Sequence, residues 1–166
     1  MRLLAALALA VCAASGLAQA EERVLDLPEG ELRYRLVDPA AAASARHTAE
    51  QMLRHLAEGD IEAAAALSNA PRRRYEVLRD YRAAIGEQEF RRVFSQYFDP
   101  ANRLVAELAI GPRRLLIWDL GAAGHHLAGQ YYVEVEGRFL MDDAPSEERS
   151  RLRRLLEAYR SGKLRF

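Results

Sequence analysis

The sequence predicts an α+β fold, in which helices are followed by consecutive antiparallel strands. Residues 44–98 carry apolar side chains at helical spacing, separated by residues that end helices. From Leu104 onward the apolar residues alternate with a period of two, which is typical of strands. The clearest alternation runs from Gln130 to Asp143. We interpret it as a hairpin at the centre of a sheet that the helices cover.

The first 20 residues have the features of a secretory signal. A basic start is followed by a short apolar core over residues 3–14 and by the cleavage site Ala18-Gln19-Ala20. We expect cleavage after Ala20 and a periplasmic or secreted protein. The core is shorter than the roughly 20 residues of a bilayer span, so no transmembrane span is expected after cleavage. Lipoprotein processing at Cys12 is the alternative, but Val11 fits poorly before it.

Composition narrows the class of protein. The single cysteine lies in the signal segment, so we expect no disulfide and a domain that is stabilised by packing. The chain has 24 basic and 24 acidic residues, and this balance argues against a dedicated nucleic-acid binder. We expect three parts after the signal: a hairpin and connector over 21–43, an α+β domain over 44–145, and a C-terminal helix and tail over 146–166.

Local signals predict the helices of the domain. Gly59 fits a C-terminal stop, Asp60 fits an N-cap, and Pro71 fits the first turn of a helix. We therefore expect helices over residues 44–58, 61–67, 71–85 and 87–98.

The strand region continues to the last helix. Residues 115–120 are apolar on both faces, which predicts a central strand, and residues 121–129 predict a glycine-rich turn. In the hairpin, Gly137 fits the turn. The apolar face should be formed by Tyr131, Val133 and Val135.

A final helix follows the domain. Ser146 fits its N-cap, and its apolar stripe comprises Leu152, Leu155, Leu156 and Tyr159. We expect this stripe to pack on the domain or on a second copy of the chain.

Two segments resemble NTF2-like domains, the α+β superfamily that includes ketosteroid-isomerase-like enzymes. Residues 56–65, Leu-Ala-Glu-Gly-Asp-Ile-Glu-Ala-Ala-Ala, are similar to the helix–Gly-Asp–helix opening of the family. Residues 135–142, Val-Glu-Gly-Arg-Phe-Leu-Met-Asp, are similar to its closing hairpin. The resemblance implies a curved sheet wrapped on a long helix, with a conical pocket between them. The N-terminal hairpin and the C-terminal helix are additions that would plug the pocket or mediate dimerisation.

Three residues are candidates for proton transfer. Asp119 follows Trp118 near the end of an apolar strand, where a carboxylate with a raised pKa could act as a general base. Alternatively, Asp119 marks the point at which the strand emerges into water. His125 and His126 could carry protons at a pocket mouth, or they are polar loop residues. Neighbouring strand residues face opposite sides and the chain lacks metal-ligand spacings, so we predict neither a metal site nor a cofactor.

Two other sets of residues are candidates for binding. Three aromatic side chains combine an apolar body with a polar tip and would line a ligand pocket: Tyr81, Trp118 and Tyr131. Three cations at the start of a helix oppose its dipole and would form an anion or lipid-headgroup patch: Arg72, Arg73 and Arg74. The alternatives are core aromatic residues and a solvated face paired with Glu76 and Asp80.

These observations favour an exported, non-catalytic binding or interaction module with a small apolar pocket. One alternative is a small pocket enzyme, isomerase- or hydrolase-like, that uses Asp119 and a histidine for proton transfer. Another is an envelope accessory protein that docks a partner through its C-terminal helix. The expected partners are a small apolar ligand, an envelope protein or a second copy of the chain.

Overall fold

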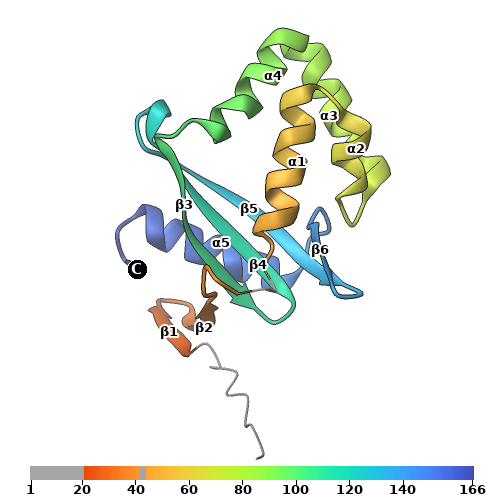
Figure 1. Ribbon diagram of the computed structural model, residues 1–166. Coiled ribbons are helices and arrows are strands. Elements are labelled where there is room, and N and C mark those ends of the chain that lie inside the picture. The colour runs from red at the N-terminus through yellow and green to blue at the C-terminus, as the bar shows by residue number, and fades with distance from the viewer. Residues whose placement is uncertain (1–20, 42–43) are drawn as a thin grey trace, which may run out of the picture.

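The computed structural model describes residues 21–41 and 44–166. The predicted signal segment and residues 42–43 of the connector lie outside the described residues. The chain has an α+β fold with one curved, six-stranded antiparallel sheet (Figure 1). The strands follow the order β1-β2-β3-β4-β5-β6, so each strand pairs with its neighbours in the sequence.

Six strands, five helices and two 3₁₀ turns make up the described fold. The strands are β1 Glu22–Leu27, β2 Gly30–Leu36, β3 Asn102–Ile110, β4 Arg113–Leu120, β5 His126–Val135 and β6 Arg138–Met141. The helices are α1 Arg46–Glu58, α2 Ile61–Ala66, α3 Pro71–Ile85, α4 Glu87–Ser95 and α5 Glu147–Arg160. Two short 3₁₀ turns, η1 Gln96–Phe98 and η2 Gly121–Ala123, complete the described elements.

Four predicted helix ends are confirmed by local geometry, whereas α1 begins at Arg46, two residues later than expected, and α4 ends at Ser95, three residues earlier than expected, after which η1 begins. Gly59 adopts a left-handed conformation, with φ at 81°, directly after α1. The Asp60 carboxylate accepts a hydrogen bond from the Ala63 amide at 3.0 Å and so caps α2. Pro71 lies in the first turn of α3. Ser146 caps α5, because its hydroxyl accepts a hydrogen bond from the Arg149 amide at 3.0 Å.

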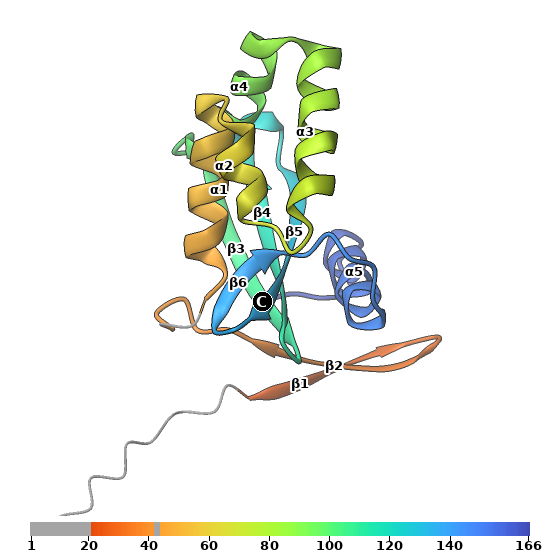
Figure 2. The same cartoon turned by 90° about the vertical axis from the view of Figure 1, so that its right-hand side faces the viewer.

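Helices cover both faces of the sheet (Figure 2). On one face, Leu116 and Trp118 of β4 belong to a core cluster with Leu53 of α1. On the other face, Leu115 and Ile117 pack in a cluster with the apolar stripe of α5. The prediction that β4 is central and apolar on both faces is therefore confirmed. The helix α5 packs within its own domain, on the opposite face of the sheet from α1.

Two expectations about the β5–β6 hairpin are wrong. The hairpin does not lie at the centre of the sheet, because β6 is an edge strand and pairs only with residues 132–135 of β5. The predicted apolar face is also incomplete, since Val135 is 39% exposed whereas Tyr132, expected on the polar face, is fully buried. The reason is that α1 covers the Tyr132 side of β5, while α5 covers the Tyr131 side.

Gly129 lies inside β5 and not in the expected turn, which spans only the residues before His126. A Cβ atom at Gly129 would lie 2.4 Å from Cδ2 of Leu156, which is closer than side-chain atoms approach. The glycine is therefore explained by the close approach of α5 to the strand.

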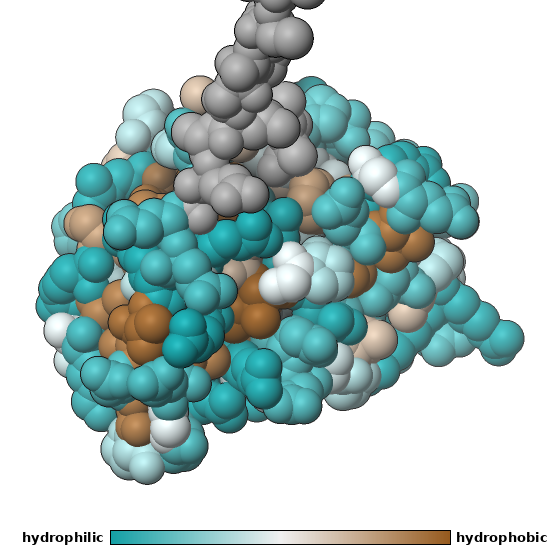
Figure 3. Space-filling view, turned by 90° about the horizontal axis from the view of Figure 1, so that it is seen from below, coloured by the Kyte–Doolittle hydropathy of each residue, from teal (hydrophilic) through white to brown (hydrophobic). Residues whose placement is uncertain are grey.

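The N-terminal hairpin extends the sheet beyond β3. The strand β2 pairs with β3 only through Arg35 and Leu36, and Leu32 and Tyr34 pack in the same cluster as α5. None of the described helices has the length and apolar character needed to cross a bilayer. The surface seen from below is largely hydrophilic, with apolar groups in small separate areas (Figure 3).

Candidate functional site

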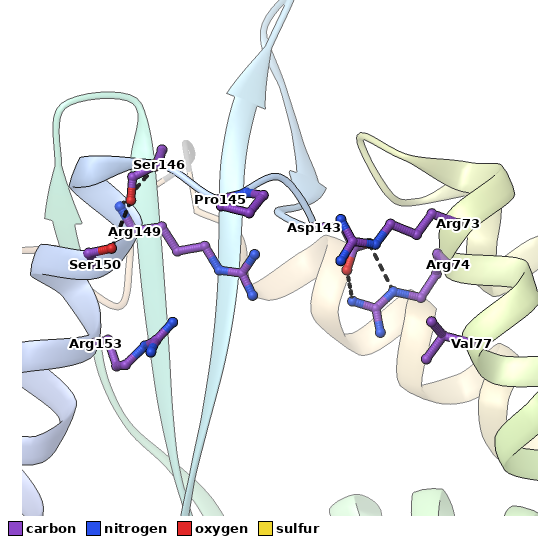
Figure 4. A pocket seen from close by; sticks show the side chains of 9 residues that line it. All are labelled: Arg73, Arg74, Val77, Asp143, Pro145, Ser146, Arg149, Ser150 and Arg153. Atoms are coloured by element: carbon purple, nitrogen blue, oxygen red, sulfur yellow. Dashed lines mark hydrogen bonds and ion pairs between the residues drawn. The ribbon is translucent and has the colours of Figure 1, made fainter.

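A basic groove lies between α3 and α5 (Figure 4). Its volume is about 280 Å³. It is lined by Arg73, Arg74, Val77, Asp143, Pro145, Ser146, Arg149, Ser150 and Arg153. We call it the arginine groove, because four guanidinium groups and one carboxylate supply its charge.

The arginines reach the groove from two helices that are distant in the sequence. Arg73 and Arg74 come from the first turn of α3, and Arg149 and Arg153 come from α5 on the opposite wall (Figure 4). The spacing of Arg149 and Arg153 is i, i+4, which places both side chains on one face of the helix. The groove therefore exists only because the fold sets these two helix faces against each other.

The charges of the groove are only partly balanced. Arg74 forms a two-pronged ion pair with Asp143, in which Nε and Oδ2 are 2.9 Å apart. Within the described part of the chain, no carboxylate pairs with Arg73, Arg149 or Arg153. The guanidinium carbon of Arg149 instead lies 5.4 Å from the centre of the Tyr131 ring, which is a cation–π contact. Three positive charges are thus left to face an anion.

A buried polar network fixes the position of the groove. Asp142 accepts hydrogen bonds from Arg113 Nε and from Asn69 Nδ2, both at 2.9 Å. The amide of the next residue, Asp143, donates to Asn69 Oδ1 at 2.9 Å. Arg113 also pairs with Glu148 of α5 at 3.2 Å. The network therefore joins β4, the end of β6, the segment before α3 and the start of α5.

Two of the three residues of the predicted anion patch lie at the groove. Arg73 and Arg74 line the groove, but the Arg72 side chain is 94% exposed and pairs with Glu76 on its own helix. The sequence analysis identified only the apolar stripe of α5 and did not identify Arg149 and Arg153 as binding residues. The i, i+4 spacing of the two residues was the available signal, but no pattern could reveal that α3 lies opposite.

The predicted proton-transfer residues do not meet in a cleft. Asp119 is buried rather than emerging into water, and its carboxylate lies 3.2 Å from Nδ1 of His125. The His125 side chain is 80% exposed, and its φ of 61° places it in the left-handed region. His126 is the first residue of β5, and the next residue, Leu127, pairs with Asp119 of β4. Because adjacent strand residues face opposite sides, the His126 side chain points to the opposite face of the sheet from Asp119.

The predicted pocket residues occupy three different environments. Trp118 faces α1, where its indole Nε1 donates to Gln130 Oε1 at 3.0 Å. Tyr131 lies on the α5 face, and burial raises the pKa of its phenol although nearby arginines act against this rise. Tyr81 is 39% exposed on α3 beside Phe90. The three therefore do not line a common pocket.

Trp118 does line a second cleft, which we call the aromatic cleft. It lies between α1, η1 and the strands β3 and β4, and its volume is about 530 Å³. Tyr97 packs edge-on against Trp118 with ring centres 5.8 Å apart, and burial raises the pKa of Tyr97. Leu53, Leu104, Phe98 and Pro100 add apolar surface, and polar or charged side chains complete the lining: Arg46, Glu50, Arg54, Asp99, Asn102 and Arg103.

Neither cleft is lined by Asp119, His125 or His126. Across residues 21–41 and 44–166, no three histidine, cysteine, aspartate or glutamate side chains gather in a manner that could hold a metal ion.

Fold and site together define a class: an α+β protein with a sequential antiparallel sheet, helices on both faces and a basic groove between α3 and α5. Comparisons with protein-family models, with curated proteins and with solved structures find no match to this chain. The resemblance to NTF2-like domains therefore stays a prediction from the two segments that carry it.

Proposed function

We propose that the protein is an exported, non-catalytic binding module that holds an anionic group in the arginine groove. The observation that carries this proposal is that three arginines with no carboxylate partner among the described residues converge on one groove between two helices. Guanidinium groups suit phosphate and carboxylate ligands, because their planar donors match two oxygen atoms at once. Export rests on the predicted signal segment.

The surroundings of the groove support binding rather than catalysis. Val77 and Pro145 supply a small apolar area beside the cations, which suits the body of an organic anion. The exposed large apolar residues are scattered over separate elements: Val24, Val77, Tyr81, Phe98, Val135 and Phe166. The apolar stripe of α5 is buried against the sheet of its own domain. A partner that docks on α5 would therefore contact the arginine side chains of this helix.

Titration calorimetry with inorganic pyrophosphate tests the proposal. The double variant Arg149→Gln/Arg153→Gln should bind more weakly than the unaltered protein, because each charged hydrogen bond contributes roughly 1.5–3 kcal/mol, or about tenfold to a hundredfold in affinity. The control is Arg151→Gln, which removes one positive charge, half the change of the double variant, from an exposed position of α5. Equal affinity of the double variant and the control would contradict the proposal.

The anionic group has two possible sources, which two probes distinguish. Vesicles of phosphatidylglycerol present the phosphate on a membrane, whereas pyrophosphate presents it in solution. Binding to vesicles alone would assign the groove to lipid headgroups, and binding to pyrophosphate alone would assign it to a soluble ligand. In both cases affinity should fall with added salt, since the groove is open to water.

The aromatic cleft supports a second candidate, a site for a small apolar ligand. The NTF2-like resemblance implies a pocket between the long helix and the sheet, and the cleft lies between α1 and the strands β3 and β4. Trp118 is the only tryptophan of the chain, so its fluorescence reports on this cleft. The neutral dye Nile red should quench it, and Leu104→Glu should prevent the quenching. Unchanged quenching in that variant would remove this candidate.

The enzymatic alternative rests on the contact between Asp119 and His125. We do not favour it, because Asp119 and His125 line neither the arginine groove nor the aromatic cleft.

A further inference from the structure

We propose that the ligand of the arginine groove is an extended acidic peptide segment, which pairs with the free edge of β5 as an additional strand. This inference rests on the proposed function, because the same arginines would bind its carboxylates.

The edge of β5 is only half covered. Along β4, the strand β5 pairs from His126 to Val133, whereas on its other side β6 pairs only with residues 132–135. Among the described strands, none therefore lies beside the stretch from His126 to Tyr131 on that side. Residues 127–131 are all partly exposed, so water reaches this edge. An open edge of this kind is a template for another strand.

Hydrogen bonds show which backbone groups point outward. The Leu127 carbonyl accepts a hydrogen bond from Nη2 of Arg160 at 2.7 Å, and the Tyr131 carbonyl accepts one from the Asp142 amide at 2.8 Å. Both contacts lie on the side away from β4. Because backbone groups alternate along a strand, Gly129 faces the same side. No described group outside the sheet pairs with the Gly129 amide or carbonyl.

The helix α5 runs beside this edge in the opposite direction. Arg149 stacks on Tyr131 and Arg160 reaches Leu127, so two contacts fix the alignment. The helical rise between these arginines is about 16 Å, which is close to the roughly 14 Å between the two strand residues. Arg153 lies on the same side of α5, one turn from Arg149. A strand on the edge would therefore run alongside two arginines without carboxylate partners.

Charge and backbone geometry together select the ligand. A peptide strand supplies amide and carbonyl groups for Gly129, and alternate acidic side chains would point to the α5 face, where Arg149 and Arg153 lie. Of the three arginines on this side of α5, Arg160 pairs with Glu157 at 2.8 Å, whereas Arg149 and Arg153 have no carboxylate partner among the described residues. A polyphosphate or an oligonucleotide would satisfy the arginines but not the backbone. The combination favours an extended acidic peptide of a few residues.

The test uses a synthetic seven-residue peptide in which glutamate and valine alternate, with glutamate at both ends. Two further versions carry N-methyl groups on alternate residues, one on the glutamates and one on the valines. Only alternate amides of an added strand face β5, so one version should bind roughly tenfold or more weakly than the parent and the other should bind like the parent. Bound parent peptide should also slow hydrogen exchange at the Gly129 amide.

Controls separate this inference from the proposed function. If Arg149→Gln/Arg153→Gln weakens pyrophosphate binding but both N-methylated peptides bind equally, the groove binds anions and strand addition is wrong. If neither pyrophosphate nor the peptide depends on these arginines, both proposals are wrong. An oligonucleotide of equal charge that binds as tightly as the peptide would also overturn the inference, because it cannot pair with the strand edge.

Discussion

Arg113 donates a hydrogen bond from Nε to Oδ2 of Asp142 at 2.9 Å, and the Asp142 side chain is 0% exposed. This pair joins β4 to the end of β6 at the base of the arginine groove. The loss of stability on breaking this pair differs from the stability that the intact pair contributes. Removing Asp142 leaves Arg113 with only the partly exposed Glu148 as a partner, and losing one partner of a buried pair costs more than the intact pair contributes.

The first prediction follows from this pair. Asp142→Ala should lower the free energy of unfolding by roughly 3–5 kcal/mol, as measured by denaturant titration. The control is Glu76→Ala, which removes the exposed partner of Arg72 and should leave the midpoint nearly unchanged. A similar small effect of both substitutions would show that the buried pair does not stabilise the fold.

The second prediction concerns α5. Leu155 is fully buried against the sheet, so Leu155→Asp should cost several kcal/mol, more than the roughly 2–5 kcal/mol of a Leu→Ala change. The melting temperature should fall equally at every protein concentration, because the helix packs within its own domain. Leu155→Met, which conserves volume, should cost less than about 1.5 kcal/mol. A melting temperature that depends on concentration would indicate packing between two copies.

The third prediction tests the close approach of α5 to β5. Gly129→Ala should destabilise the protein, because the new Cβ would overlap Cδ2 of Leu156. Leu156→Ala should also destabilise it, by leaving a cavity. The double variant should lose less stability than the two single changes combined, since the smaller side chain makes room for the methyl group. Strict additivity would mean that the two residues do not constrain each other.

The fourth prediction concerns pH. Burial raises the pKa of Tyr132 above the ordinary value of about 10, because the folded state disfavours the charged phenolate. In the unfolded chain this phenol loses its proton above about pH 10, whereas in the folded chain it keeps it. Its contribution to stability is therefore complete below pH 10 and is lost as the pH rises further.

Chemical denaturation at pH 8 and pH 11 measures this loss. Tyr132→Phe should show a smaller fall in unfolding free energy between the two pH values than the unaltered protein. At pH 8 the substitution should have a small effect, because the hydroxyl makes only a long hydrogen bond of 3.4 Å to Gln130. An equal fall in both proteins would contradict the buried position of this phenol.

Part of the site was visible in the sequence. The run of cations at the start of α3 predicted an anion patch, and Arg73 and Arg74 do line the groove. The other wall could not be predicted, because α5 appeared only as an amphipathic helix whose apolar stripe needed a partner. Arg74 and Asp143 are 69 residues apart in the chain yet form an ion pair. Contacts of that range follow from the packing of the whole domain.

The sequence by itself determined most of the helices and strands and the α+β class of the fold. Gly59, Asp60, Pro71 and Ser146 act through local backbone geometry and capping, so they were readable without a structure. The double-sided apolar strand β4 was readable for a similar reason, since it requires cover on both faces.

Only the tertiary structure decided the edge position of β6, the burial of Tyr132 and the meeting of α3 with α5. These depend on which helix covers which face, and hydrophobic burial is non-directional, so an apolar stripe indicates that it will be covered but not by what.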